Sequence, residues 1–148
     1  MKETISELNR IIEDIAGKSA ETRDWSYKSA PEKWSKKEII GHLIDSAQIN
    51  LQRFVRCTYL ENFKLVYEQD EWVRAAHYQD ADITEILTLW RLLNRQIVRV
   101  LSDYPVDRLR AQCDNSRTTQ SFHTVEWLAG DYIAHMKHHL NQIYGSYH

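Results

Sequence analysis

Apolar residues recur along four stretches of the chain at the three- and four-residue spacing of an amphipathic α-helix. The stretches start close to residues 4, 35, 82 and 124. Their apolar positions are Ile5, Leu8, Ile11, Ile12 and Ile15; Ile39, Ile40, Leu43, Ala47, Leu51 and Phe54; Ile83, Ile86, Leu87, Trp90, Leu93, Ile97 and Leu101; and Val125, Leu128, Tyr132, Met136, Leu140 and Ile143. Four such helices predict an all-α fold, a four-helix bundle.

Polar residues and glycines give these helices predicted starts and stops. A Ser, Thr or Asp followed three positions later by Glu can satisfy the free amides of a first turn. This spacing occurs at Thr4–Glu7, Ser35–Glu38 and Asp82–Glu85. Glycine commonly follows the last turn of a helix, so Gly17 and Gly145 are the predicted stops of the first and fourth helices.

The segments between the helices are predicted to be connections. Tyr67–Asp80 is expected to form a loop with a short extra helix around Trp72, between the second and third long helices. Ala111–Gln120 is polar and predicts a loop. No segment shows the sustained alternation of a strand, a repeat or low complexity. With 148 residues, we predict a single four-helix-bundle domain spanning residues 1–148.

Composition and charge exclude several classes of function. Hydrophobic residues make up 43% of the chain and charged residues 27%, which is typical of a globular protein. The net charge is −2 with Lys and Arg scattered, so neither nucleic acid nor an anionic membrane is an expected partner. There is no leader-like segment and no apolar run near the roughly 18 residues of a membrane span, so we expect a cytoplasmic protein. Cys57 and Cys113 are expected to be inert, reduced thiols.

Three of the seven histidines are predicted to face the core of the bundle. At about 100° per residue, His135 and His139 fall at the edge of the apolar arc of the fourth helix, whereas His138 falls on its polar side. His42 is flanked by core positions on the second helix. Two histidines at i and i+4 can present ring nitrogens to one ion, and a third from another helix completes a three-histidine site.

This pattern by itself leaves two interpretations open. A lone inward histidine is usually a core residue satisfied by a hydrogen bond. Three imidazoles in one small core are costly to satisfy in this way, which favours a metal. Neutral imidazole suits Zn, Ni, Cu or Fe, and the open coordination position would hold water or a thiolate substrate. From the residues alone, the structural and the metal-binding interpretations are about equally supported.

Longer segments around the histidines resemble a known family. PEKWSKKEIIGHLIDSAQINLQRF (Pro31–Phe54) and HTVEWLAGDYIAHMKHHLNQIYG (His123–Gly145) carry a tryptophan-serine helix start, a G-H-x-x-D element and an H-x-x-x-H-x-x-Q element. In this order they resemble the signature segments of the DinB/YfiT-like family. YEQDEWVRAAHY (Tyr67–Tyr78) is similar to that family's connection between helices two and three. The resemblance therefore covers nearly the whole chain.

The resemblance implies a four-helix bundle with a divalent metal, commonly nickel or zinc, held by three histidines. Matched by motif, the ligands are His42, His135 and His139. Relatives include transferases that use bacillithiol or mycothiol and a metal-dependent isomerase. The implied function is a metal-dependent enzyme, such as a thiol S-transferase or hydrolase, that activates a small thiol or water to attack a small electrophilic substrate.

Two further expectations accompany this function. Family members often form homodimers, and an aromatic content of 11% agrees with an exposed contact surface. The alternative function is a non-catalytic, dimeric, stress-related protein that binds a metal or a small ligand. This alternative stays open because the sequence shows no identifiable general acid or base, so catalytic residues are unknown and the enzyme is favoured by the resemblance alone.

Other polar residues are predicted to have secondary roles. Asp45 either orients His42 or, more commonly for such a position, is a surface carboxylate. Gln142 can bond a ligand or a neighbouring helix, and a structural role is favoured. His77 is expected to be an exposed loop residue. Arg53 lies about 16 Å along the helix from His42, too far for direct contact with a ligand.

Overall fold

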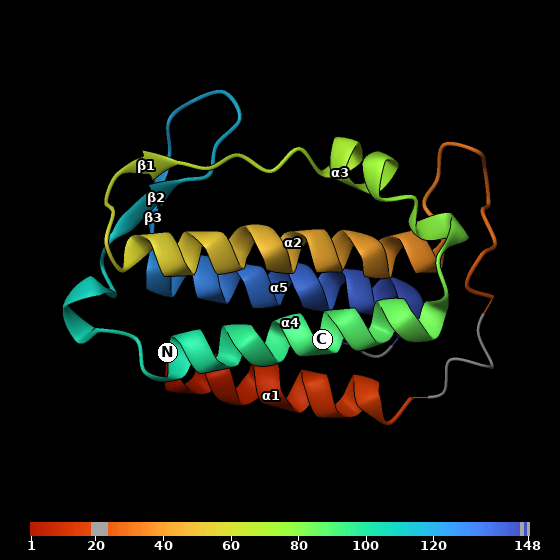
Figure 1. Cartoon of the computed structure of the whole chain (residues 1–148), viewed down its shortest axis with the longest axis horizontal. Coiled ribbons are helices and arrows are strands. Elements are labelled where there is room, and N and C mark those ends of the chain that lie inside the picture. Colours follow the sequence, from red (N-terminus) through yellow and green to blue (C-terminus); the bar gives the residue numbers. More distant parts are fainter. Residues whose placement is uncertain (19–23, 146, 148) are drawn as a thin grey trace.

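The computed structural model describes residues 1–18, 24–145 and 147 of the chain. Its four long helices are α1 (Lys2–Ala16), α2 (Lys36–Cys57), α4 (Ile83–Ser102) and α5 (Val125–Tyr144). They lie alongside one another as a bundle, and a shorter helix, α3 (Gln69–Ala76), lies against the outer side of α2 (Figure 1). The predicted four-helix bundle with a short extra helix between its second and third long helices is therefore confirmed.

A small sheet lies at one end of the bundle. It consists of the strands β1 (Phe63–Lys64), β2 (Gln112–Asp114) and β3 (Phe122–Thr124), in that order across the sheet. β1 pairs parallel to β2, and β2 pairs antiparallel to β3. The prediction of a loop over Ala111–Gln120 is thus wrong for β2. Strands of two or three residues are too short to show the alternation that identifies a strand in a sequence. Two 3₁₀ turns, η1 (Tyr78–Asp80) and η2 (Val106–Arg108), complete the described elements.

Three predicted helix starts and both predicted stops, Gly17 after α1 and Gly145 after α5, are confirmed. The Ser35 hydroxyl accepts the Glu38 amide, and the Glu38 carboxylate accepts the Ser35 amide, which forms the complete capping box at the start of α2. Asp82 and Thr124 cap α4 and α5 through their side-chain oxygens, which accept the amides of Glu85 and Trp127. Gly145 ends α5 in the left-handed conformation, at φ 73°, which glycine adopts without steric cost.

The predicted capping box at Thr4–Glu7 is wrong. α1 begins at Lys2, and the amide of Ile5 already bonds the carbonyl of Met1, so Thr4 lies inside the first turn. The Glu7 carboxylate is held instead by Arg10 at 2.9 Å and by Lys137 of α5 at 3.2 Å. These ion pairs direct Glu7 outward and toward α5, away from the start of its own helix.

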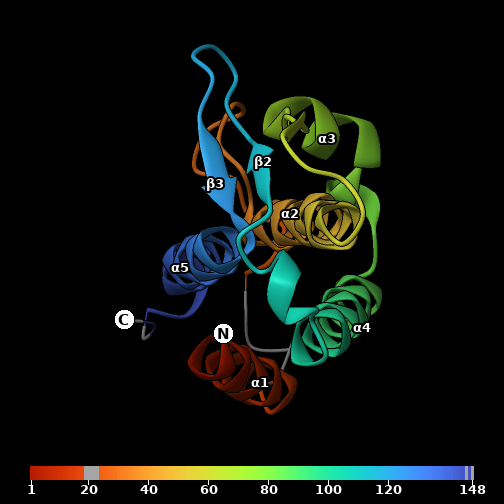
Figure 2. The same cartoon turned by 90° about the vertical axis from the view of Figure 1, so that its left-hand side faces the viewer.

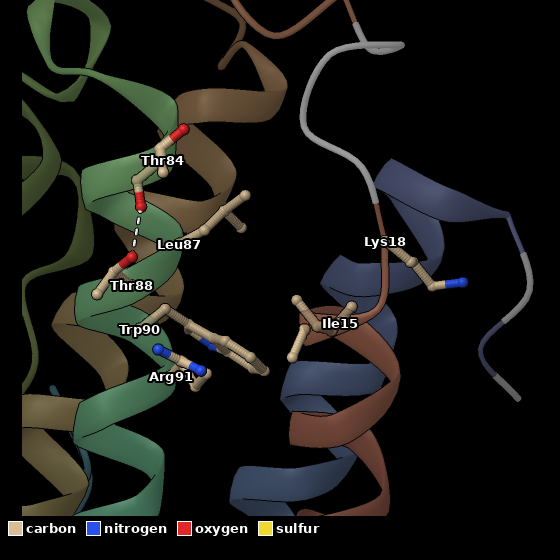
Figure 3. A pocket seen from close by; sticks show the side chains of 8 residues that line it. Ile15, Lys18, Thr84, Leu87, Thr88, Trp90 and Arg91 are labelled. Carbon is tan, nitrogen blue, oxygen red and sulfur yellow. Dashed lines mark hydrogen bonds between the residues drawn. The ribbon is translucent and has the colours of Figure 1, made fainter.

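The apolar stripes of the four long helices meet in one core. Viewed along the bundle, α2 lies next to α4 and α5, and α1 closes the other side against the same two helices (Figure 2). Trp90 of α4 is fully buried, and its ring extends toward Ile15 of α1 beside Leu87 (Figure 3). Burying one such large apolar side chain stabilises the fold by about 1.5–3 kcal/mol. No helix in the described part of the chain is long and apolar enough to cross a membrane.

Candidate metal centre

His42 of α2 and the pair His135 and His139 of α5 converge on one point between the two helices. One ring nitrogen from each histidine lies within 4.8 Å of the others. The Nε2 atoms of His42 and His135 are 3.0 Å apart, and the three ring centroids lie 4.6 to 4.9 Å from one another. The three side chains therefore meet as their helical spacing predicts, while their role as metal ligands stays a prediction.

The burial of each histidine follows from its position on its helix. His42 is completely buried, because it lies on the face of α2 that packs against α5. His135 and His139 are half-buried, one turn apart at the edge of the apolar face of α5. His138 is exposed on the other side of that helix, as its phase predicts.

A hydrogen bond to Tyr67 determines which nitrogen of His42 carries the proton. The Tyr67 hydroxyl lies 2.9 Å from Nδ1 of His42 and also donates to the His42 carbonyl oxygen at 3.2 Å. With that single proton donated to the carbonyl, the hydroxyl oxygen accepts a hydrogen from Nδ1. The Nε2 lone pair of His42 is then directed toward His135 and the centre of the triad.

A hydrogen bond to Gln142 likewise determines which nitrogen of His139 carries the proton. Its side-chain oxygen lies 2.9 Å from Nδ1 of His139, and an amide oxygen can only accept, so Nδ1 carries the proton. The amide nitrogen of Gln142 lies 3.4 Å from His138, which agrees with this orientation of the amide. Of the two roles open to Gln142, the structure shows contact with histidines of its own helix, His139 and His138. Outer hydrogen bonds of this kind orient metal-binding imidazoles.

Burial keeps the triad neutral. It lowers the pKa of His42 to about 3 and that of His135 to about 4, and the neighbouring imidazoles lower both pKa values further. Burial also lowers the pKa of His139. Imidazole binds a metal only in its neutral form, so all three rings are in the required state at neutral pH.

Two aromatic rings pack against His42. Trp34 lies over its ring at a centroid distance of 4.9 Å, and Tyr67 stacks on it at 5.7 Å with an interplanar angle of 11°. Trp72 of α3 in turn contacts the edge of Tyr67, at 6.2 Å. These rings lower the local polarity, which strengthens any electrostatic interaction at the centre of the triad.

Asp45 does not have either of the roles predicted for it. It is buried, with 1% of its surface exposed, so the prediction of a surface carboxylate is wrong. Its Oδ1 accepts a hydrogen bond from the Tyr78 hydroxyl at 2.5 Å, and His42 is oriented by Tyr67 instead. Gly41 makes this contact possible, because a Cβ atom there would lie 2.1 Å from the Tyr78 ring. The glycine and aspartate of the G-H-x-x-D element therefore both serve to dock Tyr78 on α2.

The remaining predicted residues lie outside the triad. His77 is exposed, at a left-handed position with φ 52° between α3 and η1. Arg53 is buried, and its guanidinium donates to the carbonyl of Leu65 at 2.8 Å and to Asn50 at 3.4 Å. Cys57 and Cys113 are buried free thiols, and burial raises the pKa of Cys57 to about 11. This agrees with the expectation that they are inert.

Tyr67 is the functional residue that the sequence did not predict. It lies in the connection between β1 and α3, outside every helical pattern, so no periodicity places it near His42. The only signal is that it begins the segment YEQDEWVRAAHY, which resembles a family element.

The donor set fits a transition metal. Bonds of 2.0–2.1 Å to a tetrahedral ion would place ligand nitrogens about 3.3 Å apart. The triad offers one pair at 3.0 Å, with all three atoms within 4.8 Å, so small ring rotations would close the site. All three donors are imidazoles, which suit zinc, nickel, copper or iron better than the oxygen-seeking magnesium or calcium.

Comparison with known families identifies the chain. The sequence profile of the DinB superfamily matches residues 2–143. The chain belongs to this superfamily. Comparison with curated protein sequences gives no significant match.

Two solved structures have the same fold as this DinB-superfamily chain. YfiT from Bacillus subtilis, described as a probable metal-dependent hydrolase with an unusual four-helix bundle topology, superimposes with a TM-score of 0.77. Its sequence identity is 18%, over 95% of this chain and 80% of YfiT. The DinB-like protein YjoA, also from Bacillus subtilis, gives a TM-score of 0.60 at 16% identity, over 95% of this chain and 85% of YjoA. At such identities the two structures establish the fold.

Proposed function

We propose that the chain is a divalent-metal-dependent enzyme in which His42, His135 and His139 hold the ion. The observation that carries this proposal is the pair of outer hydrogen bonds, from Tyr67 and Gln142, that turn the lone pairs of two ligands toward one centre. A triad with a purely structural role needs no such common orientation. The description of YfiT as a probable metal-dependent hydrolase, in a protein of the same fold, supports the same function.

Zinc or nickel is the proposed ion. Three neutral imidazoles with no carboxylate among the clustered donors form a site of intermediate softness, which both ions accept. Three protein ligands leave one coordination position for a small molecule, as in catalytic zinc sites.

The proposed reaction is the attack of a small thiol or of water on a small electrophilic substrate. A bound divalent ion supplies one chemical effect, which is to lower the pKa of the attacking group toward neutrality. The residues of this chain keep the ligands neutral by burial and hold His42 and His139 in one orientation. Trp34 and Tyr67 pack against the buried His42 ring and shield it from bulk water. Transfer of a thiol and hydrolysis by water need the same site and differ only in the nucleophile.

A non-catalytic function as a metal- or small-ligand-binding protein is the second candidate. Among the described residues, no carboxylate or thiol forms a hydrogen bond to the triad. The Tyr67 hydroxyl contacts His42, and burial raises its pKa, so it stays protonated at neutral pH. The described residues at the triad thus provide no general base, and an enzyme here would depend on the metal-bound nucleophile alone.

The deciding experiment measures metal and turnover in the same preparation. Protein produced without an affinity tag is analysed for its metal content, and is then assayed for thiol transfer and for hydrolysis with and without a chelator. We expect about one zinc or nickel ion per chain and an activity that the chelator removes. Protein that lacks metal and also fails to bind added zinc or nickel at micromolar concentration would refute the metal site. Metal without turnover in either assay would favour the binding function.

We also infer that two copies of the chain pair in solution. Leu89 and Leu92, three positions apart on α4, expose 44% and 54% of their surfaces. Exposed apolar side chains on one helix are typical of contacts between subunits. Analytical ultracentrifugation is expected to show a dimer, and a single species of 17.6 kDa at about 50 micromolar would contradict this.

A further inference from the structure

Only one of the two carboxylate oxygens of Asp45 has a hydrogen-bond partner in the described part of the chain. Its Oδ1 accepts the Tyr78 hydroxyl, but its Oδ2 is buried and has no hydrogen-bond partner within the described part of the chain. A buried carboxylate oxygen without a partner is costly and calls for an external donor. The question is what supplies that donor.

A pocket next to Asp45 has room for a small ligand. Its volume is about 310 Å³, and it is open to solvent on one side. It lies between α2, α3 and η1, where α3 runs along the outer side of α2 (Figures 1 and 2). The residues that line it are Asp45, Gln48, Trp72, Ala75, Ala76 and Tyr78.

The chemistry of this lining favours a cation that can donate hydrogen bonds. Asp45 is the only charged residue in it, and neither Lys, Arg nor His is present to neutralise the carboxylate. Burial raises the pKa of Asp45 to about 6, so the carboxylate is still ionised at the usual cytosolic and assay pH of about 7.5. Trp72 and Tyr78 contribute aromatic rings, to which ammonium groups are attracted. Ala75 and Ala76 leave an apolar surface for a short alkyl chain.

We propose that this pocket binds a small primary amine in its ammonium form. The ammonium group donates to Oδ2 of Asp45, and its alkyl chain packs against Trp72 and the two alanines. This site is separate from the histidine triad, because Tyr67 lies between Trp72 and His42. The proposal does not depend on a bound metal, so it goes beyond the proposed function and can fail independently of it.

The test compares two probes of equal shape and different charge. n-Butylammonium and 1-butanol are titrated by calorimetry into the full-length protein at pH 7.5, with a chelator present throughout. We expect n-butylammonium to bind about tenfold or more tightly than 1-butanol, because only the ammonium pairs with the carboxylate. Equal binding of the two probes, or no saturable binding of n-butylammonium, would overturn the proposal and assign Oδ2 to a buried water.

Matched variants test whether Asp45 is the carboxylate that binds the ammonium group. Asp45→Asn keeps an oxygen for Tyr78 and removes the charge, so it is expected to weaken n-butylammonium binding about tenfold or more. Asp80→Asn makes the same change of charge at an exposed residue of η1 and is expected to leave binding unchanged. Equal effects of the two variants would show that the attraction is a general effect of net charge and would overturn the site.

A second pair of variants keeps the test decisive if Asp45→Asn does not fold. Ala75 lies on the exposed side of α3, so a longer side chain there leaves the core intact. Ala75→Lys places a competing ammonium group at the pocket and is expected to weaken n-butylammonium binding about tenfold, whereas Ala75→Gln weakens it less than about threefold. Similar binding in the lysine and glutamine variants would contradict an electrostatic site. A repeat of the titrations with zinc-loaded protein is expected to give the same result, because no triad residue lines the pocket.

Discussion

The hydroxyl of Tyr67 lies 2.9 Å from Nδ1 of His42 and bonds the carbonyl oxygen of the same residue. A side chain from a connection outside the bundle thus fixes both the proton and the ring of the most deeply buried member of the triad. The two residues are 25 positions apart in the chain, and their rings are stacked with an angle of 11° between the planes. The connection between β1 and α3 is therefore part of the candidate metal centre.

Tyr67→Phe is expected to reduce metal affinity by about 10- to 100-fold, because the phenylalanine ring keeps the stacking but loses the hydrogen bond that holds His42. The measurement is a competition titration with a chromophoric zinc chelator. Tyr59→Phe is the control, since Tyr59 is 66% exposed and forms no hydrogen bond or ring contact with the triad in the described part of the chain. If both variants bind zinc like the unchanged protein, Tyr67 has no positioning role.

Substitution of two adjacent histidines tests which of them binds the metal. His139→Ala is expected to lose most of the bound metal, whereas His138→Ala keeps it, because His138 is exposed about 100° around the helix from His139. Metal content is measured by elemental analysis on untagged protein. Equal losses in the two variants would mean that the triad is not the metal site.

Acid is expected to release the metal and to destabilise the fold. The pKa values of His42 and His135 in the folded protein, about 3 and about 4, lie below the ordinary value of 6.5. The unfolded chain therefore binds more protons below pH 6.5, so the free energy of unfolding falls as the pH falls, by up to about 1.4 kcal/mol per pH unit for each histidine. Above pH 6.5 this contribution is constant. A bound metal lowers these pKa values further, so its stabilisation is also lost on acidification, below about pH 4.

Melting curves over a pH series, each with and without a chelator, measure this effect. We expect a higher melting temperature for the metal-loaded protein at pH 7 and convergence of the two sets at low pH. If the melting curves with and without chelator superimpose at every pH, the triad is satisfied by its own hydrogen bonds and binds no metal.

Gly41→Ala is expected to destabilise the fold by about 1–3 kcal/mol, because the new Cβ would lie 2.1 Å from the Tyr78 ring. Gly130→Ala is the matched control on α5, where nothing lies within 4 Å of the added atom. In an open helical position, alanine is favoured over glycine by about 0.5–1 kcal/mol, so this variant is expected to be more stable. Chemical denaturation gives both values, and stabilisation by Gly41→Ala would show that Tyr78 moves aside at little cost.

The helices and the meeting of the three histidines could be predicted because both follow from short-range periodicity. The i, i+4 spacing fixes His135 and His139 on one face, and the apolar neighbours of His42 fix its direction. The contacts of Tyr67 and Tyr78 with α2 could not be predicted, since they depend on the path of an irregular connection over the bundle. Asp45 was assigned to the surface for the same reason, because the residue that buries it is 33 positions away. The family resemblance marked these segments without showing their contacts.

The segment from Tyr67 to Tyr78 is fastened to α2 at both of its ends. Tyr67 bonds His42, and Tyr78 bonds Asp45, so the two anchors lie one helical turn apart on α2 while α3 arches between them. A segment with two close anchor points stays in place over α2, because releasing one end alone leaves the other to guide it back at high effective concentration. Loss of either hydrogen bond alone is therefore expected to leave the segment attached to α2 through the other.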